Sequence, residues 1–101
     1  MATNVKNPTA VEFTSDDHAK LTGYEIDIVS SAGAVVQTIP TGKGTQDPTG
    51  LVTVPFAVQP LAFGSYTVRV RSVAAALKSV DSAPSPAWDR VPAQPVKVTI
   101  R

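Results

Sequence analysis

Apolar and polar side chains alternate most regularly between residues 66 and 71 of this chain. The apolar set is Tyr66, Val68 and Val70, and the polar set is Thr67, Arg69 and Arg71. A period of two indicates a β-strand with one buried and one exposed face. The strand follows a turn that contains Leu61 and Gly64. A tyrosine that enters a strand just after a tight corner is typical of Greek-key sandwiches, where its hydroxyl bonds to nearby backbone. We therefore predict a structural corner formed by Leu61, Gly64 and Tyr66.

The same alternation predicts further strands within residues 11–14, 24–29, 35–39, 51–56 and 96–101. The segments 15–20, 30–33 and 41–50 are polar or rich in glycine, so we expect loops there. Pro40 should end its strand, and Pro55 should mark a strand edge or end. Six or seven short strands at this spacing predict an all-β fold, a seven-stranded antiparallel Greek-key β-sandwich.

The segment 74–95 departs from this pattern. It is long for a structureless loop in a compact domain. Its start, residues 73–78, suggests the end of a strand followed by a loop, with at most one turn of helix. Four prolines should hold the rest extended, namely Pro84, Pro86, Pro92 and Pro95. Four apolar side chains should dock on the sandwich, namely Leu77, Val80, Trp88 and Val91.

The predicted core contains the inward-facing residues of the strands and of the corner. It consists of Phe13, Tyr24, Ile26, Ile28, Val52, Val54, Phe56, Leu61, Tyr66, Val68, Val70, Val96, Val98 and Ile100.

Composition limits the classes of function. A length of 101 residues suits one domain, which we place at residues 8–101 after an N-terminal extension of residues 1–7. The chain has no cysteine, which excludes disulfides and thiolate metal sites. Nine Lys and Arg against eight Asp and Glu give a net charge of +1, so charge offers no reason to expect a nucleic-acid partner. No apolar run is long enough to insert through a membrane.

The first residues lack the apolar stretch of a secretory signal. Two settings follow as expectations. In the first, the chain is one module of a longer extracellular or cell-surface protein. In the second, it is a small complete protein made in the cytosol, such as a virion component.

Several of these segments together resemble the fibronectin type III family, over roughly residues 8–101. Pro8, Val11 and Phe13 resemble its first two strands, and the segment 23–28 resembles its third. The segment 61–73 resembles its corner and sixth strand, and the segment 79–85 the serine and proline entry to its last strand. Two features depart from the family: Phe13 stands where a tryptophan is usual, and the stretch before the last strand is long. The resemblance implies an immunoglobulin-like sandwich that acts as a spacer or binding module.

The charged residues of the strands favour structure over binding. In this topology the strand of Tyr24 lies beside that of Tyr66, so Glu25 and Asp27 should share an outer face with Arg69 and Arg71. Opposite charges across neighbouring strands form stabilising pairs. We prefer that interpretation to an anion site.

Two other motifs carry little chemistry. The sequence Asp16-Asp17-His18 has one imidazole and no further ligands at metal spacing, so we interpret it as a loop. The segment 42–45 has two glycines, but it lacks the spacing and the flanking strand and helix of a phosphate-binding loop. We predict no catalytic, metal-binding or cofactor-binding residues.

Loops in such scaffolds carry function, so the segments 41–50 and 74–95 are the expected contact surfaces. The candidate interaction residues are Trp88, Lys43, Gln46, Asp81 and Arg90. Trp88 has two interpretations, a core residue beneath the long segment or an exposed interface anchor, and burial is the commoner outcome. The expected function is a non-catalytic structural or protein-interaction module without a cofactor. Its partner would be another protein or further copies of itself, either in a cell-surface assembly or on the surface of a phage particle as a decoration protein.

Overall fold

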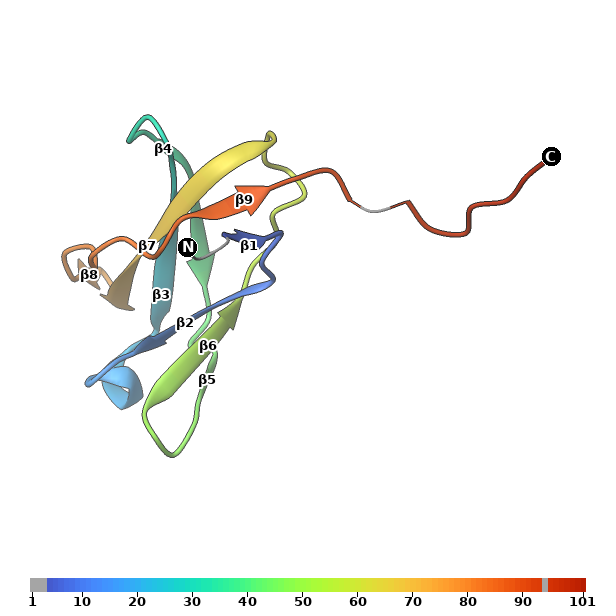
Figure 1. Ribbon diagram of the computed structural model, residues 1–101. Coiled ribbons are helices and arrows are strands. Elements are labelled where there is room, and N and C mark those ends of the chain that lie inside the picture. Colours follow the sequence, from blue (N-terminus) through green and yellow to red (C-terminus); the bar gives the residue numbers. More distant parts are fainter. Residues whose placement is uncertain (1–3, 94) are drawn as a thin grey trace.

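The computed structural model describes residues 4–93 and 95–101, and its strands form two sheets (Figure 1). This arrangement is sandwich-like, and it confirms the predicted all-β class. Within the described ranges, the helical structure is limited to one short 3₁₀ turn, His18–Lys20. It lies in the chain between the strands Ala10–Thr14 and Gly23–Ser30. No helix among these residues is long and apolar enough to cross a membrane.

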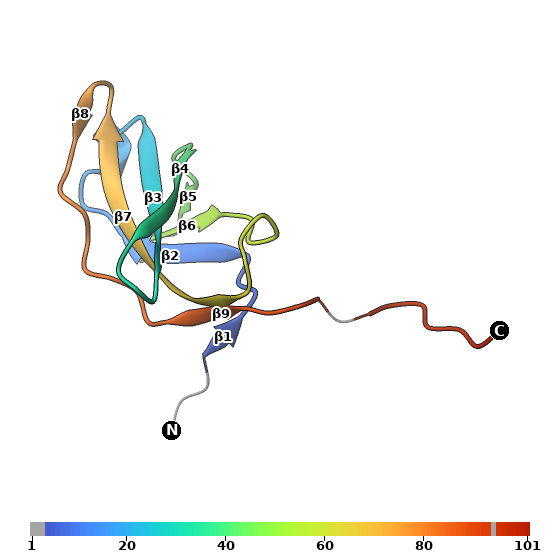
Figure 2. The same cartoon turned by 90° about the horizontal axis from the view of Figure 1, so that it is seen from above.

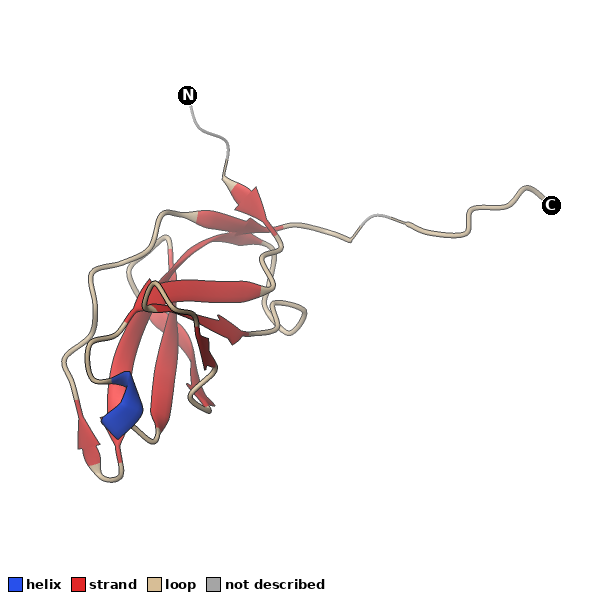
Figure 3. Ribbon diagram, turned by 90° about the horizontal axis from the view of Figure 1, so that it is seen from below, coloured by secondary structure: helices blue, strands red, loops and turns tan. Residues whose placement is uncertain are grey.

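The larger sheet has the order β1-β9-β7-β3-β4, and β8 pairs with the end of β7. Its strands are β1 (Val5–Lys6), β9 (Trp88–Arg90), β7 (Gly64–Ala74), β3 (Gly23–Ser30), β4 (Val35–Thr41) and β8 (Leu77–Lys78). The smaller sheet has the order β2-β6-β5 and consists of β2 (Ala10–Thr14), β6 (Leu51–Pro55) and β5 (Thr45–Gln46). The β1–β9 pair is parallel and the other pairs are antiparallel. Figures 2 and 3 show the sheets from above and from below.

Most of the predicted strands are present. The alternation located β2, β3, β4, β6 and β7 to within a few residues. Pro55 ends β6 as predicted. Pro40 does not end β4, which continues to Thr41. The reason is that β4 is the outermost strand of its sheet, where a missing N–H need not break a ladder.

The core lies between the two sheets. Its buried members are Tyr24, Ile26, Ile28, Val52, Val54, Val58, Tyr66, Val68 and Trp88. Phe13, Phe56, Leu61 and Val70 pack against this cluster at its margin, as the sequence predicted for core positions. Trp88 is 5% exposed. Its ring lies 5.2 Å from that of Tyr66 and 5.8 Å from that of Phe56, so the packed interpretation of Trp88 is confirmed.

The predicted corner forms. The hydroxyl of Tyr66 donates a hydrogen bond of 2.7 Å to the carbonyl oxygen of Ala62, four residues earlier. The ring of Tyr66 is buried at the start of β7. The bond therefore fixes the chain where it turns into the longest strand of the protein's described residues.

The prediction of a last strand within residues 96–101 is wrong. Val96, Val98 and Ile100 are 78%, 77% and 94% exposed, and the segment 95–101 extends away from both sheets (Figures 1 and 2). The place beside β7 is occupied instead by residues 79–90. We call the segment 95–101 the free tail.

A repeat of serines explains how the proline-rich segment replaces that strand. Ser79, Ser82 and Ser85 each bond to one residue of β7, namely Ser72, Val70 and Val68 in that order. The serine N–H groups donate to the three carbonyl oxygens at 2.9, 2.8 and 2.8 Å. The serine Oγ atoms accept from the three N–H groups at 2.8, 3.0 and 2.9 Å. Each serine thus satisfies both backbone groups of its partner, and we call the three the serine ladder.

The spacing of the serine ladder leaves other side chains outside. Three residues of the segment match two residues of β7, so the inward positions do not follow the period of an ordinary strand. Val80, between Ser79 and Ser82, is 89% exposed. Leu77, on β8 before the serine ladder, is 76% exposed, so the prediction that both dock on the sandwich is wrong. Val91 is half-buried.

Candidate functional site

A network of charges covers the outer face of the larger sheet. Arg71 on β7 lies opposite Glu25 on β3, and its guanidinium contacts three carboxylates. The Nε atom lies 2.6 Å from Glu25, and the two terminal nitrogens lie 3.1 Å from Asp27 and 3.2 Å from Asp81. Lys78 contacts the other oxygen of Glu25 at 2.9 Å. The predicted cross-strand pairing is therefore present around Arg71, and it also ties Asp81 of the long segment to the sheet.

Asp27 is the most enclosed member of this network, at 4% exposed. Its Oδ1 atom accepts a 2.7 Å hydrogen bond from Thr38 of β4 as well as the contact from Arg71. The predicted pairing of opposite charges across β3 and β7 was only partly right for Arg69. That side chain is exposed opposite Asp27, and within the described part of the chain no carboxylate lies within 4.0 Å of it.

The network holds Glu25 in its charged form. The hydrogen bond from Lys78, followed by that from Arg71, lowers the pKa of Glu25 below its ordinary value of 4.5. The same carboxylate raises the pKa of Arg71 above its ordinary value. Two further carboxylates, on a turn and on β9, behave alike. Hydrogen bonds from Thr49 and Leu51 lower the pKa of Asp47, and those from Ser65 and Asn4 lower the pKa of Asp89.

We expect replacement of Glu25 by glutamine to weaken the dependence of stability on acid. A carboxyl whose pKa is lower in the folded state stabilises that state above its unfolded pKa, and this contribution disappears as the pH falls through the folded pKa. The unfolding free energies of wild type and E25Q should therefore differ near neutral pH and converge below about pH 4. Urea titrations over a series of acidic buffers would measure this. E12Q serves as the matched control, since Glu12 has no ion pair among the described residues. Curves for E25Q and wild type that stay parallel would contradict the assignment.

His18 has a structural partner. Its Nδ1 atom lies 2.7 Å from the hydroxyl of Tyr24, and the two rings are stacked 5.9 Å apart. Across residues 4–93 and 95–101, no cluster of three or more His, Cys, Asp or Glu side chains has a geometry that could hold a metal ion. Lys43, from the glycine-containing segment, reaches the carbonyl oxygen of Ala19 at 3.4 Å.

The most distinctive surface is a groove along β2, where one side of the sandwich is open. Two hollows, of about 390 and 590 Å³, follow one another between β2 and the long segment. The first is lined by residues 13–17 and 79–82 with Val70 and Ser72, and the second by residues 5–12 and 85–88 with Phe56 and Val68. Their linings continue one another along β2, β7 and the serine ladder, so we treat them as one surface, the open-edge groove.

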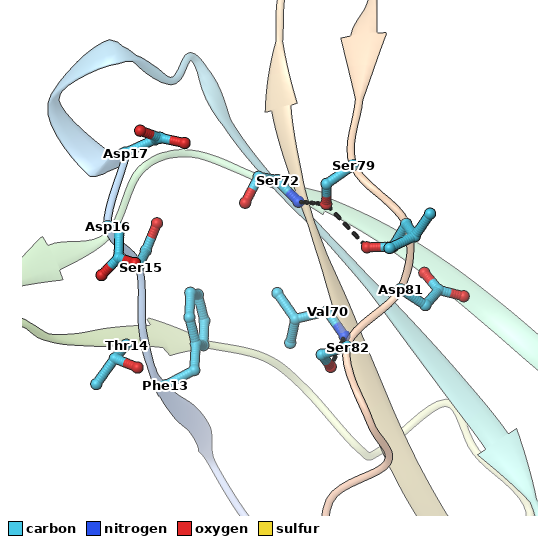
Figure 4. A pocket seen from close by; sticks show the side chains of 11 residues that line it. Phe13, Thr14, Ser15, Asp16, Asp17, Val70, Ser72, Ser79, Asp81 and Ser82 are labelled. Atoms are coloured by element: carbon cyan, nitrogen blue, oxygen red, sulfur yellow. Dashed lines mark hydrogen bonds between the residues drawn. The ribbon is translucent and has the colours of Figure 1, made fainter.

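Figure 4 shows the first hollow from close by. The side chains of Phe13 and Val70 point toward each other across it, from β2 and β7. Asp16 and Asp17 lie at one side of it and Asp81 at the other. At this end the groove therefore combines the apolar side chains of Phe13 and Val70 with a surround of hydroxyls and carboxylates.

The edge of β2 that borders the groove has no neighbouring strand in the described part of the chain. Within the described residues β2 pairs only with β6. The N–H of Phe56 donates to the carbonyl oxygen of Thr9, which directs the backbone groups of Thr9 toward β6. Since such groups alternate along an antiparallel strand, those of Val11 and Phe13 also face β6. Three residues then direct their N–H and C=O groups to the open edge, namely Ala10, Glu12 and Thr14.

The structure does not bring the predicted interaction residues together. Trp88 and Asp81 line the open-edge groove, but the indole of Trp88 is buried rather than exposed as an anchor. Gln46 donates to the carbonyl oxygens of Ser15 and Gly50, and Lys43 lies near the same end of the smaller sheet. Arg90 lies beside β1, where it donates to Val91 at 2.6 Å and covers the ring of Phe63.

Sequence reasoning did not find the open-edge groove, because alternation identifies a strand but not whether both of its edges are paired. Because we predicted that every alternating apolar segment joins the sheets, we had no reason to expect an open edge at β2. Comparisons with models of protein families, with curated proteins and with solved structures find no match for this chain.

Proposed function

We propose that this chain is a non-catalytic structural and protein-interaction module, a rigid spacer or adhesion domain of a larger extracellular or cell-surface assembly. The observation that carries the proposal is the edge of β2 that pairs with no strand among the described residues, beside a groove lined in part by apolar side chains. An exposed strand edge binds extended segments of protein through main-chain hydrogen bonds, and adjoining pockets accept alternate side chains.

The rest of the molecule supports a rigid scaffold. The guanidinium of Arg71 links β3, β7 and the long segment, and Thr38 joins β4 to the same group of charges. The serine ladder anchors residues 79–85 along β7 without a regular strand. Val11 and Phe13 of β2 pack against the core that this frame supports, which keeps the edge of β2 and the groove in a fixed relation, as a binding surface requires.

A fibronectin type III-like topology, a seven-stranded Greek-key sandwich, is part of the proposal. The corner bond of Tyr66, the pairing of β3 with β7 and the position of the serine ladder against β7 support it. In this arrangement β3 and β7 are the third and sixth strands, and residues 79–90 act as the last one. The free tail then lies beyond the domain.

A second candidate function is a phage virion surface protein of immunoglobulin-like fold that decorates or cements the particle. The free tail is the observation that favours it, because identical copies packed side by side can exchange such segments. Copurification with particles would support this setting over the first.

Site-specific photocrosslinking in the native host tests the proposed function. A photoreactive side chain at position 12 lies on the open edge of β2, and the matched control at position 32 lies in the exposed turn between β3 and β4. We expect a crosslink to protein from position 12 and none from position 32, with the captured chain identified by mass spectrometry. Equal labelling from both positions, or no protein captured at position 12, would contradict a binding edge at β2.

A further inference from the structure

The free tail has the sequence pattern of a β-strand, but it pairs with no strand among the described residues. Its sequence, Pro-Val-Lys-Val-Thr-Ile-Arg, places Val96, Val98 and Ile100 on one side and Lys97, Thr99 and Arg101 on the other. All three apolar residues are β-branched, which favours a pleated, half-buried position. In the structure they are 77% to 94% exposed, and no strand among the described residues pairs with them.

The open-edge groove has the complementary form. The segment from Val96 to Ile100 equals β2 in length, five residues each. The outward backbone groups of Ala10, Glu12 and Thr14 would pair with such a segment. Every second side chain of that segment would then face apolar residues of the groove. These groove residues are Val11, Phe13, Phe56, Val68, Val70 and Trp88. The indole N–H of Trp88 is buried there without a hydrogen-bond partner among the described residues.

The charges of the two surfaces also match. The tail carries Lys97 and Arg101 on its polar side. The groove carries carboxylates along its rim, namely Glu12, Asp16, Asp17 and Asp81. A strand that buries its valines and isoleucine in the groove would leave its two cations at the surface, within reach of these acids. Charge complementarity of this kind favours one partner and one register.

We propose that the free tail of one copy pairs with β2 of another copy and fills its open-edge groove. This proposal rests on the proposed function, and it names the segment that the β2 edge binds. The tail belongs to a second copy because Pro92 and Pro95 restrict the short connection that would have to reverse for it to reach its own groove. On pairing, Lys97 moves from its present φ of 55° to the extended region. Donor and acceptor are different surfaces, so the contact is heterologous and builds rings or filaments.

Two variants separate donor from acceptor. V98K places a charge in the middle of the apolar side of the tail, and because Val98 is outside the folded body it leaves the fold intact. T99K is the matched control on the polar side. E12P removes an N–H that points away from β6, so it blocks the acceptor edge while the β2–β6 ladder remains. T14P is a second acceptor variant of the same design, and circular dichroism checks that each protein is folded.

Sedimentation velocity of the full chain over a wide range of concentrations measures the outcome. We expect the mass of wild type and T99K to rise with concentration, and V98K and E12P to lose that rise and remain monomeric. A mixture of V98K and E12P should give a species of two chains and no larger one, since V98K retains the acceptor edge and E12P retains the donor tail.

Three results would overturn the exchange between copies. They are a wild type that stays monomeric at every concentration, an association that V98K leaves unchanged, and a mixture of V98K and E12P that stays monomeric. A crosslink from position 12 to a different protein, together with a monomeric wild type, would overturn this inference while supporting the proposed function. The absence of any crosslink would count against both.

Discussion

Replacement of Tyr66 by alanine is expected to lower the unfolding free energy by about 3 to 5 kcal/mol, the usual cost of removing a buried aromatic ring. The ring of Tyr66 is 7% exposed and lies against Trp88, so its loss leaves a cavity between β7 and β9. The bond to the carbonyl of Ala62 is lost as well. Chemical denaturation with urea, followed by far-UV circular dichroism, measures the change.

Y66F is the matched control, because it keeps the ring and removes only the hydroxyl. We expect a loss of about 1 kcal/mol, the net value of one hydrogen bond. The cost should not exceed that, since Ala62 is exposed and water can reach its carbonyl oxygen. A Y66A protein as stable as Y66F would show that the ring is not packed, and would contradict the corner described here.

Replacement of Trp88 by alanine is expected to cost a similar amount, about 3 to 5 kcal/mol. Trp88 forms the centre of an aromatic cluster with Phe56 and Tyr66, and it sits on β9, which joins β1 to β7. Its removal should therefore loosen both the core and the attachment of the N-terminal strand. The unfolding free energy from urea titration is the measurement, with protection of the β1 amides as a second readout.

W88F serves as the control for this change. Phenylalanine keeps an aromatic ring in the cluster and removes an indole N–H that has no partner among the described residues. An unpaired buried donor costs about 1 to 3 kcal/mol, which offsets part of the lost ring volume. We expect W88F to be much more stable than W88A. Equal stability of the two variants would mean that the side chain of residue 88 does not pack in the core.

The central strands and the corner could be predicted because their physics is local. Alternation of Tyr66, Val68 and Val70 reports a surface that is buried on one side only, and the corner bond joins residues four apart in sequence. The pairing of Glu25 with Arg71 followed from the same reasoning, once the strand of Tyr24 was placed beside that of Tyr66. The contribution of Asp81 from the long segment could not be anticipated by alternation.

The free tail shows the limit of that reasoning. Val96, Val98 and Ile100 have the same pattern as buried strands, but a pattern states only that a partner surface is needed, not that this chain supplies it. The place beside β7 went to a segment with no alternation at all. Its signal was a serine at every third position, Ser79, Ser82 and Ser85, which bonds to a strand through side chain and backbone together.

The open-edge groove follows from the same competition. The serine ladder and β9 occupy the edge of β7, so the free tail does not pair there. Because β2 pairs with β6 alone across residues 4–93 and 95–101, one edge of the smaller sheet stays open. Within a single copy, the free tail and the open edge of β2 therefore remain apart.

Amide hydrogen exchange along β2 tests this account most directly. In dilute protein the N–H groups of Val11 and Phe13 should exchange slowly, because they face β6, while those of Glu12 and Thr14 should exchange fast. Raising the protein concentration should slow Glu12 and Thr14 as tails from other copies pair with them. Slow exchange of all four amides in dilute protein, or fast exchange of Glu12 and Thr14 that concentration does not alter, would contradict an open edge that binds the tail of another copy.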